Sequence, residues 1–197
     1  MRDARKQERH QAITDAAYDL LAEKGYAGTS MLNIAKAAKA SNETLYRWYG
    51  DKRGLFEAMV QDNAAETEAL LKSALDDDAD PLASLKKIAP IFLAMLLGDR
   101  AILLNRAAAA DPTGELGQAI SQSGRAVIAP LFAKLIAALP DMAAHDVGQL
   151  TQAFIHLLIG DRQIKRAIGV EQAPQAEDID AHCAQAFRHF QAILEAK

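Results

Sequence analysis

The sequence has one cysteine and no long apolar run, and each absence excludes a class of protein. Cys183 stands alone among 197 residues, which rules out a disulfide within the chain and a cysteine-based zinc site and is typical of a reducing compartment. The apolar segment IAPIFLAMLLG stops at Gly98 and Asp99, short of the roughly 18 residues that a membrane-spanning helix needs. The N-terminus lacks the continuous apolar core of a signal peptide. We therefore expect a cytoplasmic protein without a membrane segment.

The motifs of several enzyme classes are also missing. The chain has no glycine-rich phosphate loop, no G-x-S-x-G and no HExxH sequence. His182 and His189 lie seven residues apart on one helical face, but Cys183 lies off that face, so the pair makes a poor metal site. These absences predict a protein that is not an enzyme and has no metal and no cofactor.

Charge is distributed unevenly along the chain. The net charge is −4, which argues against nonspecific binding of DNA by the whole molecule. Residues 1–53 nevertheless carry ten Lys or Arg against seven Asp or Glu, so this part has a charge of +3 and the remainder −7. A basic surface, if there is one, is N-terminal and modest.

The apolar pattern predicts an all-α fold. Apolar residues recur at three- and four-residue spacing, while alternating strand patterns and Asn-Gly or Asp-Gly hairpin turns are missing. We expect about nine helices, or ten if Pro130 breaks one of them instead of kinking it. The first helix starts near Arg5 and ends at Gly25. The others are expected at 31–38, 42–49, 52–76, 81–97, 99–110, 114–139, 145–168 and 177–196.

Two of these helices are short and are joined by a tight turn. Thr29 or Ser30 can cap the first and Ser41 the second, because their side-chain oxygens accept hydrogen bonds from free backbone amides. Only Lys39 and Ala40 lie between the two helices, which is too short a connection for antiparallel packing. The helices must therefore cross at a large angle, as in a helix-turn-helix.

The second short helix has two faces with different expected roles. Leu45 and Tyr49 share one face, which we expect in the core, while Thr44, Arg47 and Trp48 share the other. Side chains on this outer face can meet base edges in the major groove of DNA. The alternative is that the aromatic residues only fill space and Arg47 is solvated, and spacing alone does not decide between the two.

Residues 9–59 resemble the N-terminal DNA-binding domain of the TetR family of bacterial transcriptional regulators. The likeness keeps both order and spacing, and it consists of Gly25-Tyr26, Thr29-Ser30, Ile34-Ala35, Ser41, Thr44-Leu45-Tyr46, Tyr49, Lys52 and Leu55. The resemblance implies a DNA-binding domain at 1–52, with the helix-turn-helix at about 31–50, and a ligand-binding and dimerisation domain at 53–197. The implied DNA contacts are Thr29, Ser30, Lys39, Ser41, Asn42, Glu43, Thr44, Tyr46, Arg47, Trp48 and Lys52.

Three of these residues depart from the usual family pattern. Lys39 stands where glycine is common and would be strained if its φ is positive. Trp48 replaces a frequent histidine, so an indole takes the place of an imidazole near phosphate. Glu43 precedes Arg47 by four residues, the favourable order for an ion pair on a helix, and we hypothesise that it orients Arg47 toward guanine or accepts a hydrogen bond from cytosine.

The resemblance further implies a homodimer that binds a palindromic operator in double-stranded DNA and is released from it, as a repressor, by a small-molecule effector. The expected dimer contacts form apolar stripes on the last two helices and are Leu150, Phe154, Leu157, Phe187, Phe190 and Leu194. Polar residues within apolar helices are the candidate effector contacts: Asn105, Arg106, Ser121 and His156. The alternative function is a helical effector-binding or scaffold protein whose helix-turn-helix is vestigial.

Overall fold

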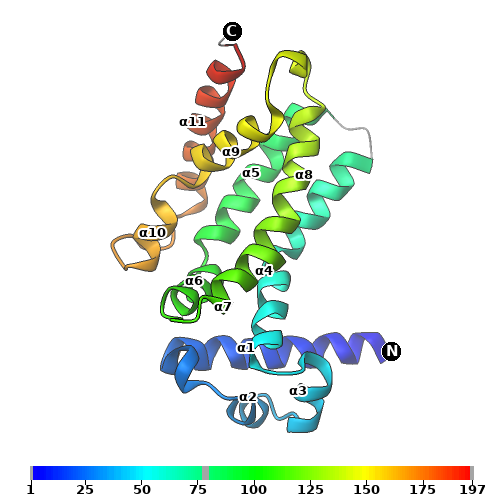
Figure 1. Ribbon diagram of the computed structural model, residues 1–197, viewed down its shortest axis with the longest axis vertical. Coiled ribbons are helices and arrows are strands. Elements are labelled where there is room, and N and C mark those ends of the chain that lie inside the picture. Colours follow the sequence, from blue (N-terminus) through cyan, green and yellow to red (C-terminus); the bar gives the residue numbers. More distant parts are fainter. Residues whose placement is uncertain (1, 77–79, 196–197) are drawn as a thin grey trace. The chain divides into compact units, whose positions relative to one another are not determined.

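The chain is built of helices joined by short turns (Figure 1). A computed structural model describes residues 2–76 and 80–195. No strand occurs in these ranges, which confirms the predicted all-α class. The α-helices are α1 (Arg2–Gly28), α2 (Met31–Ala37), α3 (Asn42–Tyr49), α4 (Lys52–Asp76), α5 (Pro81–Leu97), α6 (Asp99–Ala109), α7 (Glu115–Ile120), α8 (Ala126–Ala137), α9 (Val147–Ile159), α10 (Arg162–Ala167) and α11 (Ala176–Glu195).

The predicted start and stop signals are found at the first three helices. Gly25 has φ of 67° and ψ of 176° and interrupts α1 where that helix was expected to end. Ser30, not Thr29, caps α2 by accepting a hydrogen bond from Asn33 N at 3.2 Å. Ser41 caps α3 as predicted, because its hydroxyl accepts from the backbone amide of Thr44 at 3.1 Å.

Two long helices that the sequence predicted are each divided. The segment 114–139 contains α7, a π-helical turn η1 (Ser121–Arg125) and α8. Pro130 lies inside α8 and does not end it, so the interruption is nine residues earlier than the expected kink. The segment 145–168 is divided at Gly160, whose φ of 51° suits glycine, and α10 follows. The apolar pattern continues across both interruptions, which is why it did not reveal them.

The helices group into two compact units. The first unit comprises Met1–Asp62 with Leu103–Ser123, and the second comprises Asn63–Ile102 with Gly124–Lys197. This division differs from the single boundary expected after residue 52. The reason is core packing, since the early part of α4 is buried with α1, α2 and α3 through Leu55, Phe56 and Met59, and the later segment adds Leu104 and Leu116 to the same core.

The core of the second unit corrects the predicted dimer contacts. Phe154 and Phe190 are fully buried, and Leu150 and Phe187 are 5% exposed. The ring of Phe154 packs against those of Phe187 and Phe190, with centroids 5.3 and 4.9 Å away. Leu157 and Leu194 are partly buried against the same core. The stripes on α9 and α11 therefore face the inside of the unit, and the four buried side chains have almost no surface left to bury against a second chain.

A buried arginine holds the corner between α5 and α6. Arg166 on α10 is 6% exposed; its Nε donates to the carbonyl of Leu97 at 3.0 Å and its Nη2 pairs with Asp99 at 2.6 Å.

Among the described residues no single helix is long and apolar enough to cross a membrane. Only α5 and α6 taken together meet that test, and they are bent by 52° at this corner.

Candidate nucleic-acid interface

The helix α3 is anchored at one side chain and held at both ends. Leu45 is fully buried in the core of the first unit. At the C-terminal end, Gly50 adopts φ of 77° and closes the helix through its amide, which donates to the carbonyl of Tyr46 at 2.9 Å. Asp51 then caps α4 by accepting from the amide of Gly54 at 2.8 Å. An eight-residue helix is unstable alone, so these contacts set where its outer face points.

The outer face of α3 carries polar side chains that reach solvent. Asn42, Glu43 and Arg47 are exposed, and Tyr46 is 50% exposed. Together they offer amide, carboxylate, hydroxyl and guanidinium groups, which are the groups that read base edges and contact phosphate. Four of the expected DNA contacts are therefore available on one helix.

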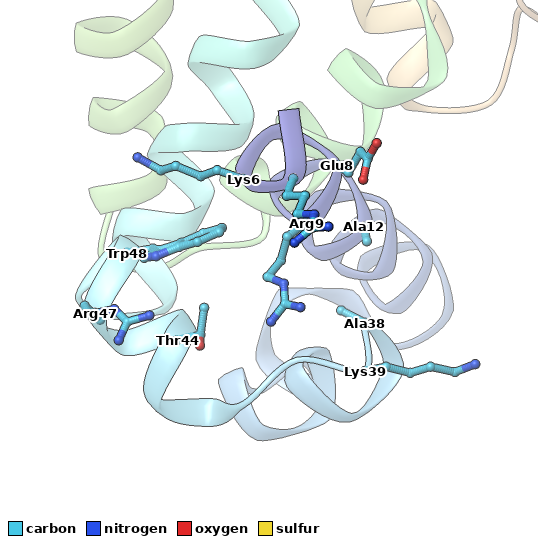
Figure 2. A pocket seen from close by; sticks show the side chains of 10 residues that line it. Lys6, Glu8, Arg9, Ala12, Ala38, Lys39, Thr44, Arg47 and Trp48 are labelled. Atoms are coloured by element: carbon cyan, nitrogen blue, oxygen red, sulfur yellow. The ribbon is translucent and has the colours of Figure 1, made fainter. Parts of the chain in front are cut away.

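A cationic cleft of about 690 Å³ lies beside this face (Figure 2). The first turns of α1 form one wall, and α3 with the turn before it forms the other. The cleft is lined by five cations and a single acid, Glu8. The cations are Arg5, Lys6, Arg9, Lys39 and Arg47. This excess of positive charge suits the phosphate backbone of a nucleic acid.

The three cations from α1 were not among the predicted DNA contacts. Arg5, Lys6 and Arg9 all line the cleft and are exposed. Their pattern was visible in the sequence, because Arg5 and Arg9 are four residues apart and so share one helical face. The resemblance to known DNA-binding domains begins only at Arg9, so it did not indicate Arg5 and Lys6.

Trp48 is half-buried at the edge of the same cleft. Its indole packs edge-on against Tyr49, with ring centroids 6.3 Å apart, and the Nζ of Lys6 lies 5.9 Å from the indole centroid. A cation at this distance from an indole is weakly attracted to the ring face. Trp48 thus joins α3 to the N-terminal turns of α1.

Lys39 meets the condition under which strain was expected. Its φ is 50°, one of two positive values at non-glycine residues in the described ranges. A lysine in this conformation costs about 1 kcal/mol relative to glycine. The side chain is exposed and lines the cleft, so the strained turn adds a cation to the surface.

Two of the predicted DNA contacts, Thr29 and Thr44, are occupied by contacts within the first unit. Thr29 is 5% exposed and its hydroxyl donates to the carbonyl of Gly25 at 2.8 Å. Thr44 is 8% exposed and its hydroxyl bonds to that of Ser41 at 2.7 Å. Both polar ends are satisfied internally and neither side chain is free to reach a base. Thr44 and Thr29 are therefore corrected from contact residues to structural ones.

Lys52 has a structural role as well. Its Nζ donates to the carbonyls of Tyr26 and Thr29, at 2.9 and 3.0 Å, and lies 4.0 Å from the centroid of the Tyr26 ring. Burial lowers the pKa of this amine, while burial and nearby carboxylates raise the pKa of Tyr26 to about 12. An ammonium that already neutralises two helix-end carbonyls is a poor phosphate clamp, which corrects the expectation for Lys52.

The hypothesised ion pair on α3 is not formed. Among the described residues no ion pair joins Glu43 to Arg47, although both are exposed. Arg47 is thus free of the partner that was expected to orient it. The remaining part of the hypothesis, that Glu43 contacts a base, stays a prediction.

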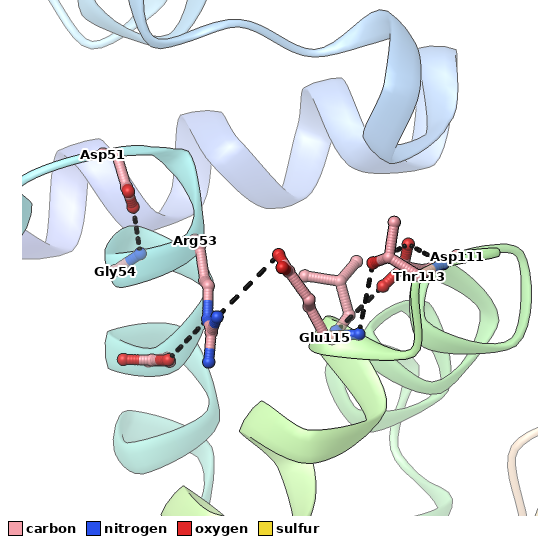
Figure 3. A network of polar contacts seen from close by, with 8 residues as sticks. Asp51, Arg53, Gly54, Asp111, Thr113 and Glu115 are labelled. Carbon is pink, nitrogen blue, oxygen red and sulfur yellow. Dashed lines mark hydrogen bonds and ion pairs between the residues drawn. The ribbon is translucent and has the colours of Figure 1, made fainter.

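A polar network holds the start of α4 (Figure 3). The guanidinium of Arg53 pairs with Glu57 at 3.1 Å and with Glu115 at 3.8 Å. The loop before α7 is closed by Asp111, which accepts from the hydroxyl of Thr113 at 2.7 Å and from the amide of Leu116 at 2.9 Å. The amide of Leu116 and the hydroxyl of Thr113 lower the pKa of Asp111. The segment 103–123 is therefore joined to the rest of the first unit by the ion pair of Arg53 with Glu115 as well as by the shared core.

The candidate effector contacts are divided between the units. Asn105, Arg106 and Ser121 belong to the first unit and His156 belongs to the second, where it is exposed on α9. No single compact unit contains all four. Their role in effector binding stays a prediction.

Comparison with known proteins agrees with this geometry. Residues 13–59 match the family model for bacterial regulatory proteins of the tetR family. This match identifies residues 13–59, which include the helix-turn-helix, as a domain of the TetR family. Two HTH-type transcriptional regulators of Bacillus subtilis, YdeS and YvkB, neither of them characterised, are 41% identical over 58 residues and 35% identical over 65 residues. These matches cover 29% and 33% of this chain and only 27% and 34% of the two relatives.

Solved structures resemble this chain over almost its whole length. A TetR transcriptional regulator from Agrobacterium tumefaciens superposes with a TM-score of 0.70 at 26% identity, covering 94% of this chain and 93% of the other. A TetR-like regulator from Rhodococcus gives a TM-score of 0.59 at 26% identity, with coverage of 96% and 97%. The likeness thus extends beyond the DNA-binding domain to the helices that follow it.

Proposed function

We propose that this chain is a cytoplasmic transcriptional regulator. It binds a palindromic operator in double-stranded DNA as a homodimer. The observation that carries the proposal is the exposed face of α3 beside a cleft lined by five cations. Asn42, Glu43, Tyr46 and Arg47 would read base edges, while Arg5, Lys6, Arg9 and Lys39 would contact phosphate. Ser30 and Ser41 lie at the starts of α2 and α3, where free backbone amides would bind phosphate groups of the DNA.

The intact helix-turn-helix argues against the alternative of a scaffold protein. A vestigial motif has no need for a strained lysine at its turn or for an uncovered row of polar side chains on its second helix. Selection of bound sequences from a random DNA library tests the proposal. We expect enrichment of one palindrome whose half-sites lie about 34 Å apart, one helical turn, because a twofold dimer places its two recognition helices in successive major grooves. Recovery of unrelated sequences only would favour the scaffold.

Replacement of Arg47 by alanine is expected to weaken operator binding about 10- to 100-fold and to relax base preference at one position in each half-site. The reason is that a bidentate arginine–guanine contact discriminates by about 1–3 kcal/mol. Fluorescence anisotropy with the selected palindrome and single-base variants of it measures both effects. Lys72→Ala, which removes an exposed cation of the second unit, should leave affinity and preference unchanged.

The α1 cations are expected to act on affinity and not on base preference. The triple substitution Arg5→Ala, Lys6→Ala and Arg9→Ala should reduce the slope of log affinity against log salt by about 2–3 per subunit, since each lost phosphate contact removes about 0.9. Binding isotherms at four or more salt concentrations measure the slope. An unchanged slope with wild-type affinity would show that the N-terminal turns of α1 do not touch DNA.

The homodimer must use surfaces other than the buried stripes. The helices α9 and α11 pack against each other, and their outward positions include Gln152, His156, Ala184 and Arg188, all exposed. We propose that these outer faces form the contact between subunits. Sedimentation at micromolar concentration should give a dimer that Ala184→Glu dissociates, and a monomeric wild type would contradict the proposal.

We further propose that a small-molecule effector releases the operator, which makes the chain a repressor. Two fold neighbours were solved in complex with lauroyl-CoA and stearoyl-CoA, and at 15% identity they establish the fold alone. These two thioesters are suitable first probes. An effector must bind the free conformation more tightly than the DNA-bound one to shift the equilibrium, so displacement of the palindrome by micromolar acyl-CoA would support this class of effector. Absence of displacement would exclude it.

A further inference from the structure

Three residues from separate helices of the first unit form a connected hydrogen-bond relay. His10 lies on α1, Tyr49 on α3 and Asp62 on α4. The Nδ1 of His10 is 2.8 Å from the hydroxyl of Tyr49, and its Nε2 is 2.6 Å from Oδ2 of Asp62. The imidazole and phenol rings also lie against each other, with centroids 5.9 Å apart. The His10 side chain is 20% exposed. Its two ring nitrogens bond to residues that lie 39 and 52 positions further along the chain, on two other helices.

The chemistry of the partners sets the direction of both bonds. The carboxylate of Asp62 only accepts, so the Nε2 of His10 carries a proton and donates to it. Neutral imidazole then has a lone pair on Nδ1, which accepts from the hydroxyl of Tyr49. Burial and the charge of Asp62 raise the pKa of Tyr49 to about 12. The phenol therefore stays protonated and can donate its hydrogen bond. Every donor in the relay has an acceptor when His10 is neutral.

The relay lies next to the surface that is proposed to bind DNA. Tyr49 is the last residue of α3, and its neighbour Trp48 lines the cleft. The N-terminal turns of α1, which carry the α1 cations, lie on the opposite wall of that cleft. The bond from His10 to Tyr49 therefore joins the two helices that form these walls, and Asp62 joins His10 to α4.

We propose that His10 is a positioning residue that sets the orientation of the recognition helix α3 relative to the α1 cations, and so sets how well the chain discriminates its operator from other DNA. This proposal rests on the proposed DNA binding. His10 itself touches no base, and it acts through Tyr49. A core contact such as Leu45 fixes the depth of α3, whereas the relay fixes its rotation about that anchor.

The test compares four proteins: wild type, His10→Ala, Tyr49→Phe and the double variant. Affinity is measured for the selected palindrome and for a shuffled duplex of the same length, together with amide hydrogen exchange of α3 in the free proteins. We expect each single variant to lower the affinity for the palindrome about three- to tenfold, as for loss of one hydrogen bond, and the double variant to lose no more than either one, because both remove the same bond. Affinity for the shuffled duplex and the salt slope should stay at wild-type values, and exchange in α3 should be faster.

Two further variants separate positioning from stability. His10→Gln keeps an acceptor for Tyr49 and a donor for Asp62, so it should restore discrimination. Gln11→Ala, an exposed neighbour on α1, should have no effect. Wild-type discrimination in His10→Ala, or additive losses in the double variant, would overturn the proposal. If the wild type itself enriches no sequence, the proposed function fails first, whereas faster exchange in α3 would still show the relay holding the helix.

Discussion

Replacement of Phe154 by alanine should destabilise the second unit by about 3–5 kcal/mol, the usual cost of removing a buried phenylalanine side chain. Phe154 is fully buried and its ring contacts Phe132, Phe187 and Phe190. Few alternative side-chain positions can fill the space that it leaves, since three aromatic rings surround it. Denaturant unfolding followed by circular dichroism measures the loss, with the midpoint compared at equal slope.

The same experiment distinguishes a core residue from a dimer contact. Lys134→Ala, at an exposed position of α8 in the same unit, should change the free energy of unfolding by less than about 0.5 kcal/mol. If Phe154 were a contact between subunits, its alanine variant would instead give a stable, folded monomer. That outcome would restore the role expected from the sequence and contradict the burial seen in the structure.

Replacement of Gly54 by alanine should destabilise the first unit by at least about 1–3 kcal/mol, as for overpacking, and should abolish DNA binding. A β-carbon at Gly54 would overlap the carbonyl oxygen of Tyr49. That oxygen belongs to the backbone and cannot rotate aside, so α4 and the end of α3 must move apart. Thermal unfolding and binding to the selected palindrome measure the two consequences.

Gly117→Ala is the matched control for this substitution. It makes the same chemical change in a helix of the same unit, where a β-carbon would meet nothing within 4 Å. Alanine is favoured over glycine inside a helix by about 0.5–1 kcal/mol, so this variant should be as stable as the wild type or more so. Equal destabilisation by both substitutions would mean that the contact between Gly54 and Tyr49 is not the cause.

The helices of the DNA-binding domain could be predicted from the sequence because capping and turn residues act locally. Ser41, Gly25 and Gly50 act through the backbone of their own or adjacent residues, so their types and spacing specify caps and turns directly. Leu45 was placed in the core by helical periodicity alone, and it is fully buried. Lys39 was singled out because the resemblance places glycine at this turn position, and its φ is positive.

The wrong predictions concern polar groups whose hydrogen-bond partners are distant in sequence, or whose hydroxyl is already bonded to a neighbouring side chain. Lys52 bonds to carbonyls 23 and 26 residues away, and nothing in its neighbours along the chain indicates this. Thr44 lies one helical turn from a serine that binds its hydroxyl, so its position on the outer face did not make it available. His10 was overlooked for the same reason, because its partners are 39 and 52 residues away.

The dimer stripes show a different limit of periodicity. An apolar stripe on a helix identifies a face that is buried without saying what buries it. On α9 and α11 the partner is the core of the same chain, and a surface for a second subunit must be sought among the more polar positions opposite.

Binding of the purified protein to DNA from upstream of its own gene, over a range of salt concentrations, tests the central claim most directly. We predict at least about 10³-fold tighter binding to that DNA than to a shuffled duplex, with affinity that falls steeply as salt rises because the cationic cleft and α3 displace counterions from phosphates. Equal, weak binding to both duplexes at low salt, with and without acyl-CoA, would contradict the claim that this surface reads DNA.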